Sequence, residues 1–271
     1  MALPKSVVPT YEDTIPSNGK KIKYRPFLVK EEKLLLLTMQ NEPVLPDQIG
    51  GILFEDLPTE TKRELLDAVE EERVEWEKEV ERVVKDTLKS CIQSRIKLED
   101  LASFDLEYLF IKIRARSSGE DVNLKITCKD DNKTVVNKTI DLLEVEVVKP
   151  DGHDNKIMLS DELGVVMRYP SVDAFIRITL LNNDLDDQDE LSTLIAGCID
   201  QMFDSEDVYD DTTTSAKEKI EFLDGLTNQQ FAKLNSFFDT MPYLAHRFKA
   251  TNPETGVESD YELRGLQSFF G

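Results

Sequence analysis

The most regular hydrophobic pattern in the chain lies in the segment Phe104–Glu120. Apolar side chains recur there at the i, i+3, i+4, i+7 spacing of one helix face, at Leu106, Leu109, Phe110 and Ile113. Tyr108 and Ile111 widen this face until the helix is apolar nearly all round, which is typical of a central core element. Asp105 can cap the start of the helix and Gly119 can end it. We therefore expect a buried helix here.

A second helical pattern is longer and strongly acidic. Thr61 and Glu64 can form a capping box at its start, and an apolar stripe then continues to Ile92. The opposite face is rich in glutamate, which indicates a solvated surface. Because about 30 residues is long for a helix of a globular protein, a break near Glu71–Arg73 is an alternative to one continuous helix.

The rest of the pattern alternates short helices with strands separated by turns. Turn residues predict three hairpins, at Asn18-Gly19, Asp130–Asn132 and Asn252–Gly256. A strand pair is expected at Ile157–Leu159 and Val165–Arg168. Helices are expected at Phe27–Met39, at Ser171–Leu181, at Leu191–Phe203 and after a capping box formed by Thr227 and Gln230, with loops at 41–58 and 204–215. The predicted fold class is α+β, predominantly helical with several short antiparallel β-hairpins.

The polar segment Lys149–Asn155 marks a candidate boundary between two regions. It contains proline and glycine, and the hydrophobic pattern changes register across it. On this basis, residues 1–148 form an N-terminal α+β region and residues 149–271 form a C-terminal α+β region. One compact unit is the alternative, because 271 residues can form one large domain or two modest ones.

The charge balance limits the classes of partner. The chain has 54 acidic and 33 basic residues, a net charge of −21. A surface this negative repels phosphate backbones and anionic lipids, so neither nucleic acid nor a membrane is expected as a partner. No apolar stretch is long enough to span a membrane, and the N-terminus does not resemble a signal peptide. Cys91, Cys128 and Cys198 form no CxxC pair, which favours buried thiols in a reducing, intracellular compartment.

The sequence contains no recognisable catalytic motif. It lacks a G-x-S-x-G nucleophile elbow, a G-x-G-x-x-G fingerprint and a phosphate-binding loop. The carboxylate cluster Asp184–Glu190 does not have the spacing of a calcium loop, and the acidic first turn of a helix is the simpler interpretation. A metal-dependent hydrolase that uses this cluster is the alternative function. We expect no enzymatic activity, no catalytic or metal-binding residues and no cofactor.

Three aromatic residues are candidate contacts for a partner protein. Trp76 lies on the acidic helix, and Phe269 and Phe270 lie next to the C-terminus. Aromatic side chains often contribute much of the binding energy at protein interfaces. For Phe269 and Phe270, packing in the core is an equally good interpretation.

Six stretches along the chain resemble one known family. They are YRPFLVKEEKLLLL (24–37), VKDTLKSCI (84–92), FDLEYLFIKIRARSSGE (104–120), LGVVMRYPS (163–171), FLDGLTNQQFAKLNSFFDTMPYLAH (222–246) and LRGLQSFFG (263–271). Together, and in this order, they are similar to the base-plate protein family of T4-type contractile-tailed phages. Residues 41–74 depart from the family pattern and are interpreted as an insertion.

The resemblance implies a role in the central hub of the phage tail baseplate, either as a hub subunit or as a factor needed to assemble the hub. It implies contacts with other hub proteins, and a location in the host cytoplasm during tail assembly or in the virion tail baseplate. The negative surface favours an assembly chaperone, through charge complementarity to a basic hub protein. None of the six stretches is a catalytic motif, and the oligomeric state is left open.

Overall fold

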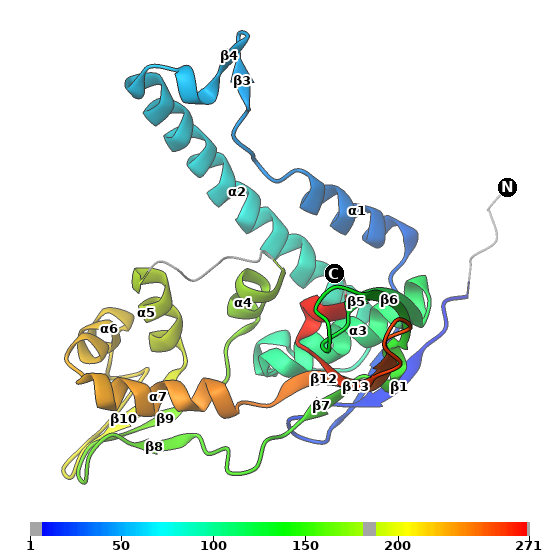
Figure 1. Cartoon of the computed structure of the whole chain (residues 1–271). Helices are drawn as coiled ribbons and strands as arrows, with labels where there is room; N and C mark the ends of the chain where they lie inside the picture. The colour runs from blue at the N-terminus through cyan, green and yellow to red at the C-terminus, as the bar shows by residue number, and fades with distance from the viewer. Residues whose placement is uncertain (1–6, 181–187, 270–271) are drawn as a thin grey trace, which may run out of the picture.

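A computed structural model describes residues 7–180 and 188–269 of the chain and shows an α+β fold (Figure 1). Helices account for 44% of the residues and strands for 24%, and the strands form small antiparallel sheets. The predicted fold class is therefore confirmed. Among the described residues, no helix combines the length and the apolar character that crossing a membrane requires.

The elements follow one another in this order. Before the linker lie β1 (Tyr11–Thr14), β2 (Lys21–Tyr24), α1 (Val29–Gln40), β3 (Gln48–Ile49), β4 (Ile52–Leu53), α2 (Thr59–Cys91), α3 (Ser103–Ser118), β5 (Asp121–Thr127), β6 (Val135–Asp141) and β7 (Glu146–Val148). After it lie β8 (Lys156–Met158), β9 (Gly164–Met167), α4 (Val172–Phe175), α5 (Gln188–Gly197), β10 (Ile199–Phe203), β11 (Val208–Asp210), α6 (Ala216–Asp224), α7 (Asn228–Thr240), β12 (Tyr243–Thr251) and β13 (Glu258–Arg264). Short 3-10 turns occur at η1 (Phe54–Asp56), η2 (Leu98–Asp100), η3 (Leu142–Glu144) and η5 (Leu266–Phe269), and a π-helical turn, η4 (Ile176–Leu180), follows α4.

The first hydrophobic core surrounds α3, as its pattern predicts. Leu106, Leu109, Ile111 and Ile113 are fully buried in it, together with side chains from β2, the last turns of α2, and η5. Asp105 does not cap α3 as predicted but lies in its first turn. Its carboxylate accepts hydrogen bonds from the backbone N–H of Ala102 (3.1 Å) and of Ser17 (2.9 Å), and thereby ties the first hairpin to the helix.

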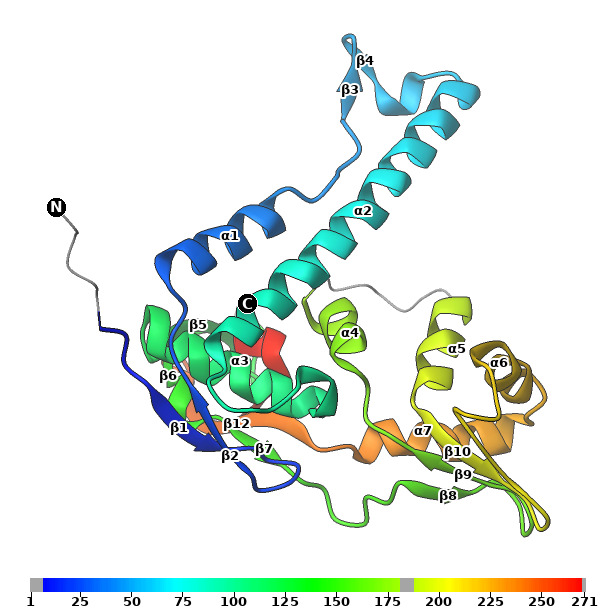
Figure 2. The same cartoon turned by 180° about the vertical axis from the view of Figure 1, so that it is seen from behind.

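A second, smaller core forms between β8–β11 and the helices α5, α6 and α7. The chain leaves the first core after β7, through the predicted linker, and returns to it through β12. Strand β12 pairs with both β7 and β13, with Leu244 opposite Val147. The segment that builds the second core is thus flanked on both sides by segments of the first (Figures 1 and 2). The division into regions 1–148 and 149–271 stays a prediction.

Several elements differ from the sequence-based expectation. Helix α2 runs without a break through Glu71–Arg73. The segment Leu191–Phe203 is not one helix, because α5 ends at Gly197 and β10 begins at Ile199. A short apolar run can form either a helix or a strand. Residues Ile199–Phe203 form a strand because they pair with β9. Helix α6 and strand β11 lie in segments for which no helix or strand was predicted.

Candidate functional site

The most unusual part of the surface is an arm formed by α1, the β3–β4 tip, η1 and the first two-thirds of α2. We define the arm as residues 29–79. Figures 1 and 2 show that it projects from the rest of the molecule. Every residue of α2 is described, and its buried side chains begin only at Val80, with Val83, Val84, Thr87, Leu88 and Cys91 following. The helix is therefore anchored in the core at its C-terminal end and leaves it at its N-terminal end.

A buried ion pair holds the base of the arm. Arg25 and Glu31 form two hydrogen bonds, of 2.7 and 2.8 Å, and both side chains are almost fully buried. Ser90, in the last turn of α2, donates a third hydrogen bond to Glu31 (2.9 Å), and the backbone N–H of Leu28 donates a fourth (2.8 Å). The Arg25 guanidinium and these donors lower the pKa of Glu31 to about 2. This cluster fixes the start of α1 against the end of α2.

Further out, Trp76 joins the two helices of the arm. Its indole Nε1 donates a 2.7 Å hydrogen bond to the backbone carbonyl of Thr38 in α1. Leu35 and Met39 are partly buried on the same side of α1. Trp76 is itself half-buried, so it lies within the candidate surface and also supports it.

The C-terminal aromatic candidates have a different position. Phe269 is fully buried in the first core, so it packs inside the protein and is not presented to a partner. Gly265, with a φ of +73°, adopts a conformation that other residues rarely take. The backbone N–H of Gly265 donates a 2.8 Å hydrogen bond to the backbone carbonyl of Leu244. Turn η5 begins directly after Gly265 and brings Phe269 into the core. Phe270 lies outside the described residues, and its role as a contact stays a prediction.

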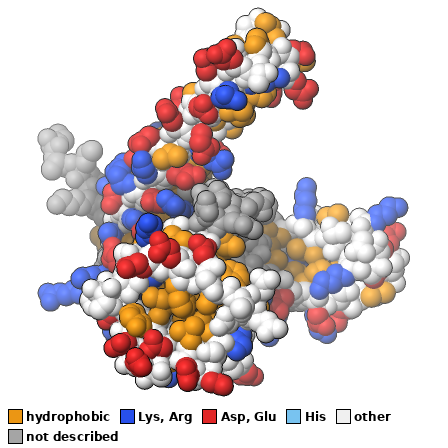
Figure 3. Space-filling view, turned by 90° about the vertical axis from the view of Figure 1, so that its left-hand side faces the viewer, with side chains coloured by type: hydrophobic (Ala, Val, Ile, Leu, Met, Phe, Trp, Pro, Cys, Tyr) orange, Lys and Arg blue, Asp and Glu red, His pale blue; other side chains and the backbone are white. Residues whose placement is uncertain are grey.

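Exposed apolar side chains are concentrated on the arm. In the described part of the chain, 16 large apolar residues are exposed, and 10 of them lie within residues 29–79. They are Val29, Leu34, Leu36, Leu37, Val44, Leu45, Ile52, Leu53, Leu66 and Val74. Figure 3 shows hydrophobic side chains along the arm and at its tip, interspersed with acidic ones. Exposed apolar groups gathered in one place usually mark an interaction surface, whereas single apolar residues scattered over a surface are normal and need no explanation.

The arm is also acidic. Residues 29–79 contain 15 acidic and 6 basic side chains, which is a net charge of −9 out of the −21 of the whole chain. Some of the basic side chains are engaged within the arm. Lys78 pairs with Glu75 (2.8 Å), and Arg73 lies 3.6 Å from Glu77. The arm therefore combines apolar contacts with a surplus of negative charge.

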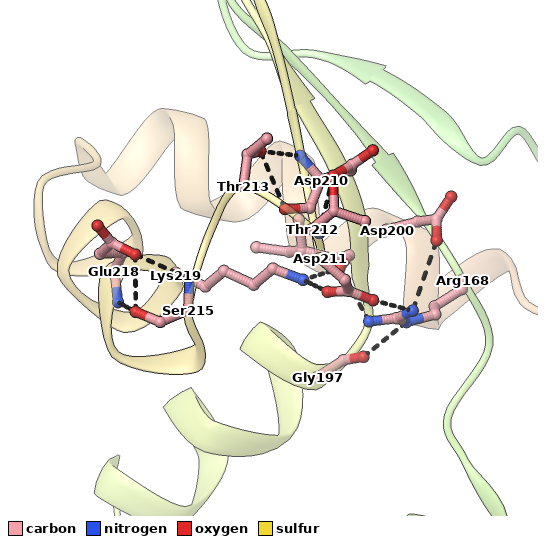
Figure 4. A network of polar contacts seen from close by, with 11 residues as sticks. Arg168, Gly197, Asp200, Asp210, Asp211, Thr212, Thr213, Ser215, Glu218 and Lys219 are labelled. Carbon is pink, nitrogen blue, oxygen red and sulfur yellow. Dashed lines mark hydrogen bonds and ion pairs between the residues drawn. The ribbon is translucent and has the colours of Figure 1, made fainter.

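A polar network in the region of the second core has a structural role (Figure 4). Arg168, which follows β9, donates to Asp211 (2.7 Å) and to the backbone carbonyl of Gly197 (3.0 Å). Lys219 of α6 is buried and donates to Asp211 and to the carbonyl of Ile199 (2.6 Å). The two cations lower the pKa of Asp211 to about 2. The network joins α5, α6 and the β9–β10 sheet.

A hollow beside this network is lined by His153, Asp154, Asn155, Met167, Arg168, Tyr169 and Asp200. Its only imidazole is already hydrogen-bonded at both ring nitrogens. Nδ1 lies 3.0 Å from the Thr240 hydroxyl, and Nε2 lies 3.1 Å from the Tyr169 hydroxyl. Burial lowers the pKa of His153 below its usual value. His153 thus connects the linker to α7 and to Tyr169, and neither ring nitrogen is left to act on a substrate.

The remaining chemical candidates are a carboxylate cluster and the three cysteines. Of the carboxylate cluster Asp184–Glu190, residues 184–187 lie outside the described part of the chain, and the side chains of Asp189 and Glu190 are not described. Among the described residues, no group of three or more His, Cys, Asp or Glu side chains could hold a metal ion. All three cysteines are buried, as expected, and burial raises the pKa of Cys91 to about 11 and that of Cys198 to about 12. These two thiols are therefore protonated, and unreactive, at neutral pH.

Sequence reasoning missed the main feature of this surface. The run Leu34–Leu37 predicts a helix correctly, but four consecutive leucines give no sign that three of them are exposed. The only available signal was the combination of this run with the proline-rich and acidic segment that follows it. That segment is the predicted insertion 41–74, and it supplies the tip of the arm and about half of α2.

Comparison with known protein families gives a match over most of the chain. The family model described as T4 bacteriophage base plate protein matches residues 8–53 and 44–271. The two matched segments overlap within the arm, and whether residues 41–74 are an insertion stays a prediction. No curated protein and no solved structure matches the chain. Because the matched segments span nearly all of its length, this chain belongs to the T4 bacteriophage base plate protein family.

Proposed function

We propose that this baseplate protein serves the central hub of the contractile tail as a non-enzymatic assembly protein, acting through protein–protein contacts. The observation that carries the proposal is the arm, where apolar side chains project into solvent in a member of a baseplate family. An apolar surface of this kind is suited to a partner protein, because burying it releases water from both surfaces.

The chemistry of the described residues supports a role without catalysis. The polar side chains that are brought together, around Asp211 and around Glu31, are satisfied by partners within the protein. His153 has both ring nitrogens engaged, and Cys91 and Cys198 are protonated in the core. The alternative, a metal-dependent hydrolase, depends on the cluster Asp184–Glu190, whose side chains lie outside the described part of the chain.

The acidic surface favours an assembly factor over a permanent hub subunit. A net charge of −21 keeps the protein soluble, and it can shield a basic hub protein until that protein is built into the baseplate. The partners are thus other hub proteins, and the site of action is the host cytoplasm while the tail is being built.

Mass spectrometry with isotope-labelled peptide standards tests this proposal. The protein is quantified in purified virions and in extracts of infected cells, and tails are examined when the gene is disrupted. An assembly factor gives tails without a hub on disruption, and far less than one copy per hub in the virion. A stoichiometric amount in the virion would instead show a permanent subunit. Normal tails on disruption would contradict a role in the hub.

A further inference from the structure

We infer that the arm binds an apolar surface edged by lysine or arginine side chains on a different protein, and that it does not bind a second copy of this chain. The inference rests on the proposed function only for the expectation that this protein belongs to the baseplate. The chemistry of the partner follows from the arm itself.

Helix α1 has apolar side chains both against the core and in solvent. Leu34 and Leu37 lie three residues apart on α1 and are both exposed, and Leu36, which is 56% exposed, lies beside them. Leu35 and Met39 on the same helix pack inward against the first core. Helix α1 therefore uses one face within the protein and presents other leucines to solvent, as a helix does when it binds in an apolar groove.

Acidic side chains accompany these apolar ones on the arm. Helix α2 carries nine acidic and four basic residues between Thr59 and Glu79. Three of the basic ones are engaged within the arm: Lys62 donates to the carbonyl of Glu55, and Arg73 and Lys78 pair with neighbouring glutamates. The charge presented outward is therefore negative. Two such arms repel each other when they are brought into contact, whereas lysine or arginine at the edge of a partner surface complements them.

Contacts along the arm hold its two helices in place. The Arg25–Glu31–Ser90 cluster fixes its base, Trp76 ties α2 to α1, and α2 continues without a break from the tip into the core. A surface that is already ordered loses little conformational entropy on binding. The arm is thus built to dock as it stands.

Site-specific photo-crosslinking in phage-infected cells tests the inference. The full-length chain carries benzoylphenylalanine in place of Leu36 on the arm, or in place of Val208. Val208 is similarly exposed but lies away from the arm, on the edge strand β11. After irradiation, the crosslinked peptide is identified by mass spectrometry. Two double charge reversals are then added to the Leu36 probe: Glu64→Lys with Glu71→Lys on the arm, and Asp161→Lys with Glu162→Lys as the matched control away from it. All four of these acidic side chains are exposed.

We expect the Leu36 probe to give an adduct with a different protein, at a surface segment that combines apolar residues with a surplus of lysine or arginine. The yield falls at least tenfold with the arm reversals and is unchanged with the control reversals. An adduct with a second copy of this chain, or no adduct at all, would overturn the inference. So would a crosslinking yield from the Val208 probe equal to that from the Leu36 probe, or a Leu36 yield that the arm reversals leave unchanged.

The identity of the crosslinked protein separates this inference from the proposed function. If the adduct has the expected chemistry but the partner is not a hub protein, the inference stands and the hub proposal fails. If hub proteins crosslink only to the Val208 probe, the hub proposal stands and the inference about the arm fails.

Discussion

The two ends of α2 carry the same kind of sequence but have opposite surroundings. Apolar residues recur at helical spacing from Leu65 to Cys91. From Val80 onward they are buried in the first core, whereas from Thr59 to Glu79 no side chain of this fully described helix is buried. The periodicity thus predicts that the segment is helical and which face is apolar, but it does not show what covers that face.

The difference shows which part of the apolar face of α2 is covered within the chain and which part is left in contact with solvent. At the C-terminal end of α2, the apolar face is covered by β2, α3 and η5 of the same chain. At the other end, α1 covers only part of the face, through Trp76 and its neighbours. The remaining apolar side chains are surrounded by carboxylates, which keep the arm soluble until a partner covers them.

The same substitution at the two ends of α2 gives the largest expected contrast. Leu88→Ala leaves a cavity in the first core, where Leu88 is 1% exposed, and is expected to lower the free energy of unfolding by about 3 kcal/mol. Leu66→Ala, at a position 47% exposed on the arm, is expected to change it by less than about 0.5 kcal/mol. Urea unfolding followed by circular dichroism measures both. Equal losses would show that the arm is covered in the free protein.

Glu31→Gln tests the cluster that joins the arm to the body. The change leaves the buried Arg25 guanidinium without its counter-charge and is expected to cost about 2 kcal/mol at pH 7. The pKa of Glu31 is lowered from 4.5 to about 2 in the folded protein, so the unfolded chain binds more protons between these values. The stabilisation is therefore present above pH 4.5 and is lost as the pH falls towards 2.

The measurement is urea unfolding of both proteins at several pH values. The difference between the unmodified protein and the Glu31→Gln variant should narrow below pH 4.5. Glu12→Gln is the matched control, because Glu12 pairs with Lys21 on the surface, where solvent screens the pair. A difference that stays constant down to pH 2 would mean that the Glu31 carboxylate does not stabilise the base of the arm.

Capping residues and turn residues made much of the fold predictable. Thr227 and Gln230 form the expected capping box of α7, and the hairpins turn near Asn18-Gly19, Asp130–Asn132 and Asn252–Gly256. These signals are local, since the hydrogen bond or backbone conformation they specify lies within a few residues. Two other expected caps were wrong, because α2 begins at Thr59, ahead of Thr61, and Asp105 lies inside the first turn of α3.

The features that the sequence did not decide, or predicted wrongly, depend on distant residues. Strand β10 exists because β9 and β11 pair with it, and the buried position of Phe269 depends on how η5 folds back beside α3. The exposure of Leu34, Leu36 and Leu37 likewise depends on the direction in which α2 leaves the core. No pattern within a short window contains that information. For this reason the candidate site was only partly predictable, through Trp76.

Glu107→Gln tests a carboxylate on α3, for comparison with the exposed carboxylates of the arm. Burial raises the pKa of Glu107 on α3 from 4.5 to about 7. The folded protein therefore binds more protons than the unfolded chain between these values, and ionisation of Glu107 costs stability as the pH rises from 4.5 through 7. Replacing it by neutral glutamine is expected to raise the free energy of unfolding by about 1 kcal/mol at pH 8 and to leave it unchanged at pH 4.5.

Chemical denaturation at the two pH values measures this gain. Glu64→Gln is the matched change on the arm, where the side chain is exposed and its replacement should have little effect at either pH. If Glu107→Gln gave no gain at pH 8, the carboxylate would have to be solvated in the folded protein, and the contrast with the arm would disappear.

Trp76→Phe is the smallest change, and it tests whether the two helices of the arm open separately from the body. Phenylalanine keeps an aromatic ring but cannot donate to the Thr38 carbonyl, a loss worth about 1 kcal/mol. Because this bond lies in the arm, the loss should appear in local opening of α1 and not in global unfolding. Amide hydrogen exchange of α1 is expected to become about fivefold faster while that of α3 is unchanged. Acceleration in α3 as well would mean that the arm and the core unfold as one unit, because breaking a contact within the arm would then weaken both.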